Sequence, residues 1–292
     1  MLLLWYFEGV RGDFMRISYM FLDYITAKIK KDDNLFDDLF KLTNAELDEN
    51  DTAFFLALRL YNFAMGMDCN YFNQDTAKKM RDAIRKKDYD SAFELVYHEY
   101  KYACVKVTMK LEYQEKKLNR QMMVPLRESI SFLICACLVA FRTEGYHMAS
   151  LETKGKSFVF QNEIDENDFY FFADRYYNAE NCYLYQLIGF TKSAIITYDY
   201  GDNWKFKTTF AKCTYFTDEE PFITLTKGNG YGIWEDNHYF FDMFLNNEDM
   251  KDDDDFEPNN IPFDFYDTKL DELNENFNDD VIVMHNCFTD YR

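Results

Sequence analysis

Chain-breaking residues are scarce in this sequence, which contains only 10 Gly and 4 Pro among 292 residues. Hydrophobic residues make up 48% of the chain, and 30 Phe and 23 Tyr supply large, rigid apolar surfaces. A chain of this length and composition can bury a substantial core, which excludes disorder throughout. The aromatic excess also leaves rings available for interfaces with other molecules.

Long apolar runs are also missing. The longest, Leu133 to Phe141, has nine residues, whereas a membrane helix needs about 20. The apolar segment Met1 to Phe7 has no basic flank and no small-residue cleavage site, so it does not have the pattern of a signal peptide. We therefore expect no membrane span and no membrane partner.

A disulfide framework is absent as well. The seven cysteines are odd in number and mostly set among apolar neighbours: Cys69, Cys104, Cys135, Cys137, Cys182, Cys213 and Cys287. This scatter indicates free thiols in a reducing compartment, and we expect a cytoplasmic protein.

Positive charge is in deficit, because 32 Lys or Arg face 52 Asp or Glu and leave a formal charge of −20. Such a surface repels phosphate backbones unless its basic residues are segregated on one face, so we expect no direct nucleic-acid partner. Between Lys78 and Arg127, however, 13 basic residues outnumber 7 acidic ones. This basic stretch is either an ordinary solvated face or a surface that pairs with an acidic one, on another copy or on a partner.

The hydrophobic period predicts an α+β fold. Apolar residues recur at helical spacing in the first half, which indicates a helical region 1–145 with one long helix from Ser91 to Leu118. Region 146–292 is aromatic-rich and predicts a mainly antiparallel sheet. The expected strands are Ser157 to Gln161, Phe169 to Tyr177, Tyr183 to Phe190, Ala194 to Tyr200 and Trp204 to Phe216, with a turn at Asp199 to Asn203.

The segment 248–280 forms an acidic arm, with 14 Asp or Glu against Lys251 and Lys269. Aromatic side chains in a polar segment are natural interface anchors, so Phe256, Phe263, Phe265 and Tyr266 are the predicted partner-binding residues. The alternative is that these rings pack back onto their own domain.

Several motifs were weighed for chemistry. The stretch Gly228 to Gly232 lacks the spacing of phosphate-binding loops and is better explained as a β-turn or bulge. The run Asp252 to Asp255 lacks the glycine and distant Glu of a calcium loop. The histidines, His147 among them, share no motif, and each is interpreted as structural or superficial. We therefore expect no metal, no cofactor and no catalytic residue.

The C-terminal end reads as a strand from Val281 to Met284. An apolar strand edge of this kind is covered by a symmetry mate, which predicts a homo-oligomer. The predicted self-association residues are Val281, Val283, Cys287, Phe288 and Tyr291. His285 and Cys287 lie on one face of that strand, and their use in catalysis or metal binding is the alternative.

Taken together, the length, the acidic balance, the aromatic-rich body, the helical first half and the end Val281-Ile282-Val283-Met284-His285-Asn286-Cys287 resemble the Gabija anti-defence family of phage proteins. The resemblance implies a non-enzymatic inhibitor in the host cytoplasm that assembles around a bacterial defence nuclease complex and blocks DNA binding and cleavage. Two alternatives stay open. One is an acidic DNA mimic, and the other is an enzyme of unknown class that uses carboxylates or the His285 and Cys287 pair.

Overall fold

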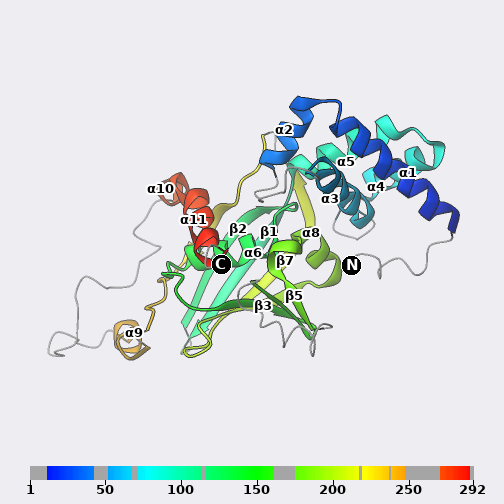
Figure 1. Ribbon diagram of the computed structural model, residues 1–292. Coiled ribbons are helices and arrows are strands. Elements are labelled where there is room, and N and C mark those ends of the chain that lie inside the picture. The colour runs from blue at the N-terminus through cyan, green and yellow to red at the C-terminus, as the bar shows by residue number, and fades with distance from the viewer. Residues whose placement is uncertain are drawn as a thin grey trace. The chain divides into compact units, whose positions relative to one another are not determined.

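The computed structural model describes residues 12–42, 52–67, 72–113, 116–160, 175–216, 219–236, 238–246 and 270–289. The chain divides into two compact units, which are described one at a time (Figure 1). The helical unit comprises Met1–Ala103 with Phe216–Glu220, and the sheet unit comprises Cys104–Tyr215 with Pro221–Arg292.

The helices of the helical unit begin at polar side chains that accept hydrogen bonds from the first helical turn. They are α1 (Gly12–Ile29), α2 (Asp33–Lys41), α3 (Thr52–Gly66), α4 (Gln74–Lys86) and α5 (Tyr89–Tyr102). Asp32 caps α2, Asn73 caps α4 and Asp88 caps α5, each through its side-chain oxygen. Phe63 lies at the centre of the core, where its ring meets the edges of Phe72 and Tyr100.

The sheet unit is built on eight strands in the order β5-β4-β3-β6-β7-β1-β2-β8. Their bounds are β1 (Ala103–Tyr113), β2 (Lys116–Pro125), β3 (Ala149–Thr153), β4 (Lys156–Val159), β5 (Tyr176–Asn178), β6 (Ser193–Tyr198), β7 (Trp204–Phe216) and β8 (Thr224–Asn229). The pairs β1–β2, β2–β8, β3–β4, β3–β6 and β6–β7 are antiparallel, and β4–β5 is parallel.

One face of this sheet is covered by helices and the other faces solvent. Helix α6 (Ile130–Ala140) is buried along its whole length and packs on β3 and β6. Helix α11 (Phe277–Thr289) packs on α6 in turn (Figure 1). The remaining helical segments of the unit are η3 (Ala179–Asn181), α8 (Leu184–Phe190), α9 (His238–Leu245) and α10 (Leu270–Glu275).

The predicted fold class is confirmed, because a helical first half leads into a mainly antiparallel sheet. The strand Trp204–Phe216 and the turn at Asp199 to Asn203 are confirmed too. The five cysteines within the described residues are free thiols, as expected. Within the same residues, no helix combines the length and the apolarity needed to cross a bilayer.

Three expected elements are corrected. The chain changes from helix to strand at Ala103, not near residue 145, because buried and solvent-facing side chains alternate from Val105 to Leu111. The long helix Ser91 to Leu118 therefore ends at Tyr102. The segment Tyr183 to Phe190 is helix α8 and not a strand.

The third correction concerns the C-terminal end, where the expected strand is helix α11. Its buried residues Phe277, Val281, Met284 and Phe288 recur at intervals of four, three and four, which is the helical period. The β-branched run at Val281 to Val283 favours a strand only locally. Packing of this apolar stripe on α6 decides the conformation.

Candidate metal centre

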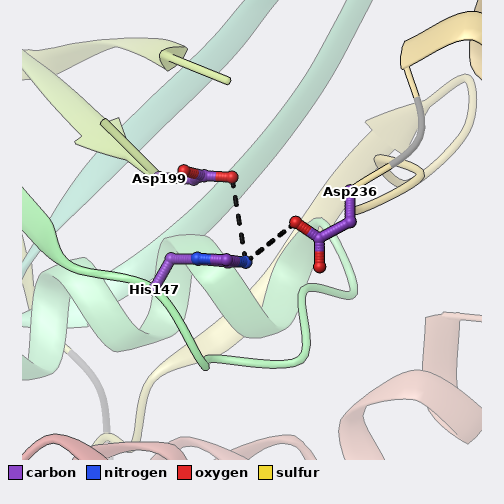
Figure 2. Close-up of side chains that lie close together, drawn as sticks. All are labelled: His147, Asp199 and Asp236. Atoms are coloured by element: carbon purple, nitrogen blue, oxygen red, sulfur yellow. Dashed lines mark ion pairs between the residues drawn. The ribbon is translucent and has the colours of Figure 1, made fainter. Parts of the chain in front are cut away.

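Three loops of the sheet unit bring one histidine and three carboxylates together at one end of the sheet. His147 comes from the connection between α6 and β3, Asp199 directly follows β6, and Glu235 with Asp236 follow β8. These four residues are called the His147 site. Figure 2 shows that the imidazole edge of His147 points between the carboxyl groups of Asp199 and Asp236.

Turn geometry sets the direction of two of the carboxylates. Asp199 has φ 52° and Asp236 has φ 57°, so both adopt the left-handed conformation that aspartate tolerates better than most residues. The Asp199 Oδ1 atom accepts hydrogen bonds from the backbone N–H groups of Gly201 (3.0 Å) and Asp202 (3.3 Å). These bonds leave its Oδ2 atom directed at His147.

The imidazole Nε2 atom of His147 is the centre of the cluster. It lies 3.1 Å from Oδ1 of Asp236. Asp199 Oδ2 and Glu235 Oε1 each lie 3.8 Å from it. The Nε2 atom is itself buried and has no partner in hydrogen-bonding geometry. A ring nitrogen in this position faces oxygen atoms on three sides.

A second layer of hydrogen bonds fixes Glu235. The hydroxyl of Tyr198 donates to Glu235 Oε1, and the backbone N–H of Glu144 donates to Oε2 at 2.6 Å. The Tyr198 hydroxyl also accepts a bond of 3.1 Å from the backbone N–H of Gly145. Tyr198 is completely buried. Such supporting bonds are typical of ligands whose orientation matters for a metal.

The electrostatics of the site follow from burial and from the charges that face each other. Burial raises the pKa of Glu235, and the donated bonds from Glu144 and Tyr198 only partly oppose this rise. Burial by itself lowers the pKa of His147, but the facing charges of Asp199 and Asp236 raise it above its ordinary value. The protein thus concentrates negative charge around one imidazole, and a cation in the same place reduces that repulsion.

The geometry suits a divalent cation. One ligand atom each from His147, Asp199 and Asp236 lies within 4.8 Å of the others, and Asp199 is buried while Asp236 is exposed. Carboxylate oxygens with one imidazole nitrogen form a mixed donor set, which first-row divalent ions accept more readily than Ca²⁺ does. The exposed side at Asp236 leaves room for water or another ligand atom.

The sequence-predicted pair His285 and Cys287 is not brought together with this site. On helix α11 the two side chains point to different faces, and Cys287 is exposed. The His285 Nε2 atom lies 3.0 Å from the Ser131 hydroxyl, and its ring stacks on Phe132. The expectation that both lie on one strand face is therefore wrong.

The predicted interface residues divide into two groups. Val281 and Phe288 are buried inside the sheet unit, and only Val283 and Cys287 of the self-association set are exposed on α11. Self-association through a strand edge is thus corrected, while self-association itself stays a prediction. The remaining residues lie outside the described part of the chain: Tyr291, Phe256, Phe263, Phe265 and Tyr266.

The Gly-rich stretch is a turn, as predicted. Gly230 follows β8 with φ 72°, and a Cβ atom there would lie 2.4 Å from the Leu118 side chain. A Cβ at Gly232 would lie 2.7 Å from the carbonyl oxygen of Phe141. These glycines let the chain pass close to the core on its way to Glu235 and Asp236.

Sequence reasoning missed the His147 site because its members come from separate loops. His147 and Asp236 were each noticed, but no spacing joins them to Asp199. The one available signal was the turn at Asp199 to Asn203, where an aspartate at a strand end often has a second role as a ligand.

Comparison with known proteins gives a family and one distant structure. A family model described as plasmid pRiA4b ORF-3-like protein matches residues 103–275. A protein of unknown function from Methanosarcina mazei Go1 has a similar solved structure, with 17% sequence identity and a TM-score of 0.45 over 59% of this chain and 97% of that one. No curated protein matches. The matched family region contains all four residues of the His147 site.

Proposed function

This chain belongs to the plasmid pRiA4b ORF-3-like protein family, and we propose that it binds a divalent cation through the His147 site in the family's matched region. The observation that carries the proposal is the buried Nε2 atom of His147, which is surrounded by carboxylate oxygens and makes no hydrogen bond. A bound cation would replace repulsion between these carboxylates with attraction.

The cation would join three loops that are far apart in the sequence. His147 precedes β3, Asp199 closes the β6 end of a hairpin, and Asp236 follows β8. A ligand that binds only the folded protein stabilises it, by about 2.7 kcal/mol at a concentration 100 times its Kd. The exposed position beside Asp236 leaves a coordination site for water, a substrate or a partner's carboxylate.

We expect Mn²⁺ and Zn²⁺ to raise the melting temperature of the protein and to bind with one site per chain at pH 8, where the ligands are deprotonated. Isothermal titration calorimetry and thermal unfolding measure these effects. Because the Cys287 thiol is exposed and itself binds soft metals, the titrations use a Cys287→Ser background. His147→Ala and Asp199→Asn should each weaken binding at least about tenfold.

The matched control is His98→Ala, which removes an exposed histidine from α5 and should leave the metal affinity unchanged. Equal binding by His147→Ala and the parent protein would place the metal elsewhere, for example on the acidic segment 248–280. Absence of binding heat with both ions would refute the proposal. Metal-dependent hydrolysis of a test ester or phosphodiester, lost in Asp199→Asn, would extend it to catalysis.

We propose, as a second function, inhibition of a bacterial defence nuclease by direct protein contact. The family takes its description from a plasmid protein, and an anti-defence role suits a gene carried by a mobile element. The specific structural support is a set of exposed apolar side chains in the helical unit, each more than 40% exposed: Tyr19, Met20, Phe40, Phe54 and Phe55. Exposed aromatics of this kind are common anchors of protein interfaces.

The test is a DNA-cleavage assay with a purified Gabija nuclease complex and this protein at equal concentration. We expect inhibition, and we expect the double variant Phe54→Ala with Phe55→Ala to weaken it at least about tenfold because two aromatic anchors are lost. The control is Tyr146→Ala with Phe222→Ala, which removes two exposed rings from the sheet unit. Undiminished cleavage in the presence of excess protein would eliminate this function.

A further inference from the structure

Basic residues are concentrated in the strands of a chain that is otherwise strongly acidic. The eight strands contain ten Lys or Arg and two Glu, a balance of +8, whereas the whole chain carries −20. The basic residues are Lys106, Lys110, Lys116, Lys117, Arg120, Lys156, Lys205, Lys207, Lys212 and Lys227, and the acidic ones are Glu112 and Glu152. The charge average that disfavours polyanions therefore does not describe the sheet.

Strand alternation places many of these lysines on the face opposite α6. Lys106 and Lys110 on β1 alternate with buried residues, as do Lys205 and Lys207 on β7. Lys227 on β8 pairs with Gln121 of β2, so it shares the face of that side chain. These five lysines define the open sheet face.

The open sheet face is hollowed around three of its lysines. The hollow has a volume of about 560 Å³. Its lining comprises Lys110, Lys154, Lys205 and Lys207, the hydroxyl residues Thr153, Thr191 and Ser193, and Glu152, Ala194 and Ile195. Among the described residues, Lys110, Lys205 and Lys207 form no ion pair. Positive charge is thus held in a concave surface without a compensating carboxylate beside it.

The chemistry of this face matches a phosphate backbone better than a protein surface. Ile195 is 42% exposed and is the one large apolar side chain of the hollow, whereas protein interfaces are built around buried apolar or aromatic anchors. Ammonium and hydroxyl groups are the donors that bind phosphate oxygens. At physiological salt the Debye length is about 8 Å, so carboxylates elsewhere on the chain are largely screened from a ligand held here.

From these observations we infer that the open sheet face binds the phosphate backbone of a nucleic-acid strand, without sequence preference. The lysines neutralise phosphates and the neighbouring Thr and Gln side chains supply further donors. This inference departs from the expectation of no direct nucleic-acid contact, which rested on net charge alone. It is independent of the cation proposed at the His147 site.

Fluorescence anisotropy of the full-length protein with a labelled single-stranded oligonucleotide of about 30 nucleotides tests the inference. We expect binding at about 50 mM salt that weakens steeply as salt rises, because each neutralised phosphate releases counterions. The triple variant Lys110→Glu, Lys205→Glu, Lys207→Glu should lose about 30-fold or more in affinity and show a shallower salt dependence. Replacing the same lysines with Gln gives a second variant if charge reversal disturbs folding, which circular dichroism monitors.

The matched control reverses three exposed lysines of the helical unit, Lys78, Lys79 and Lys86 on α4. It introduces the same change in net charge within the other basic stretch, so it should lose far less affinity than the sheet variant. An equal loss in both variants would assign the effect to net charge and overturn the inference. So would the absence of binding at low salt, or displacement of the oligonucleotide by polyglutamate at equal charge concentration, which would favour an acidic protein partner.

Discussion

Replacing Arg120 with Ala is expected to lower the free energy of unfolding of the sheet unit by about 3 to 5 kcal/mol. Arg120 on β2 is completely buried. Its guanidinium donates to four backbone carbonyl groups, those of Ala140 at 2.8 Å, Asn119 at 2.9 Å, Asn229 at 2.6 Å and Tyr231 at 3.0 Å. It also stacks over the ring of Phe141.

The large expected effect follows from what the substitution leaves behind. An alanine removes every one of these donors at once, and each buried carbonyl that loses its partner costs about 1 to 3 kcal/mol. Arg120→Lys should recover only part of the loss, because an ammonium on a flexible stem does not reproduce the planar fork. Urea unfolding followed by the fluorescence of the buried Trp204 measures the change.

The matched control is Arg142→Ala in the same unit. Its guanidinium is 43% exposed and pairs with Asp280 at 3.8 Å. An exposed pair of this kind contributes about 0 to 1 kcal/mol. If Arg120→Ala cost no more than Arg142→Ala, the buried guanidinium would not be a pillar of the sheet unit.

The role of Arg120 was not predictable from the sequence, although the strand around it was partly readable. In the sequence, Arg120 is one of many basic residues between Lys78 and Arg127, and that stretch predicts a charged helical surface. The structure buries Arg120 because its partners come from α6 and from the turn after β8. Local composition does not show which charges meet backbone groups from distant segments.

Elements with a regular local pattern were predicted well. The hairpin of β6 and β7 combines aromatic and β-branched runs with an Asp-Tyr-Gly-Asp-Asn turn, and both signals agree. At β1 the signals conflict, because Cys104, Val107 and Leu111 fit a helical spacing while the alternation from Val105 onward fits a strand. Pairing with β2 along the whole length of β1 decides in favour of the strand.

The C-terminal end shows how tertiary packing overrides local preference. Val281, Ile282 and Val283 favour a strand, but α6 offers a wholly apolar helix that needs cover. A helix with buried residues at the α11 spacing covers it and leaves Val283 exposed. The same override separates His285 from Cys287, so the catalytic alternative that depended on a shared strand face loses its geometric basis.

The stability of the helical unit is expected to fall as pH rises through about 7, because of Glu99 on α5. This carboxyl is 2% exposed, and its Oε2 atom has no hydrogen-bond partner. Burial raises the pKa of Glu99 to about 7, against the opposing effect of a hydrogen bond with Thr76. The folded state therefore binds this proton more tightly than the unfolded chain, whose carboxyl has its ordinary pKa of 4.5.

The sign of the effect follows from this difference. The stabilisation from the protonated carboxyl is complete below about pH 4.5 and is lost as pH rises through about 7, where the buried group ionises. A shift of this size corresponds to about 3 kcal/mol. Glu99→Gln removes the titration, so its stability relative to the parent protein should increase by about 3 kcal/mol between pH 4 and pH 8. Denaturant unfolding at a series of pH values, followed by circular dichroism at helical wavelengths, gives this difference directly. Glu94→Gln removes an exposed carboxyl from the same helix, where hydration of the charge is retained, and should change the curve little. A Glu99→Gln curve that runs parallel to the parent curve at all pH values would show that Glu99 is ionised in the folded state without cost.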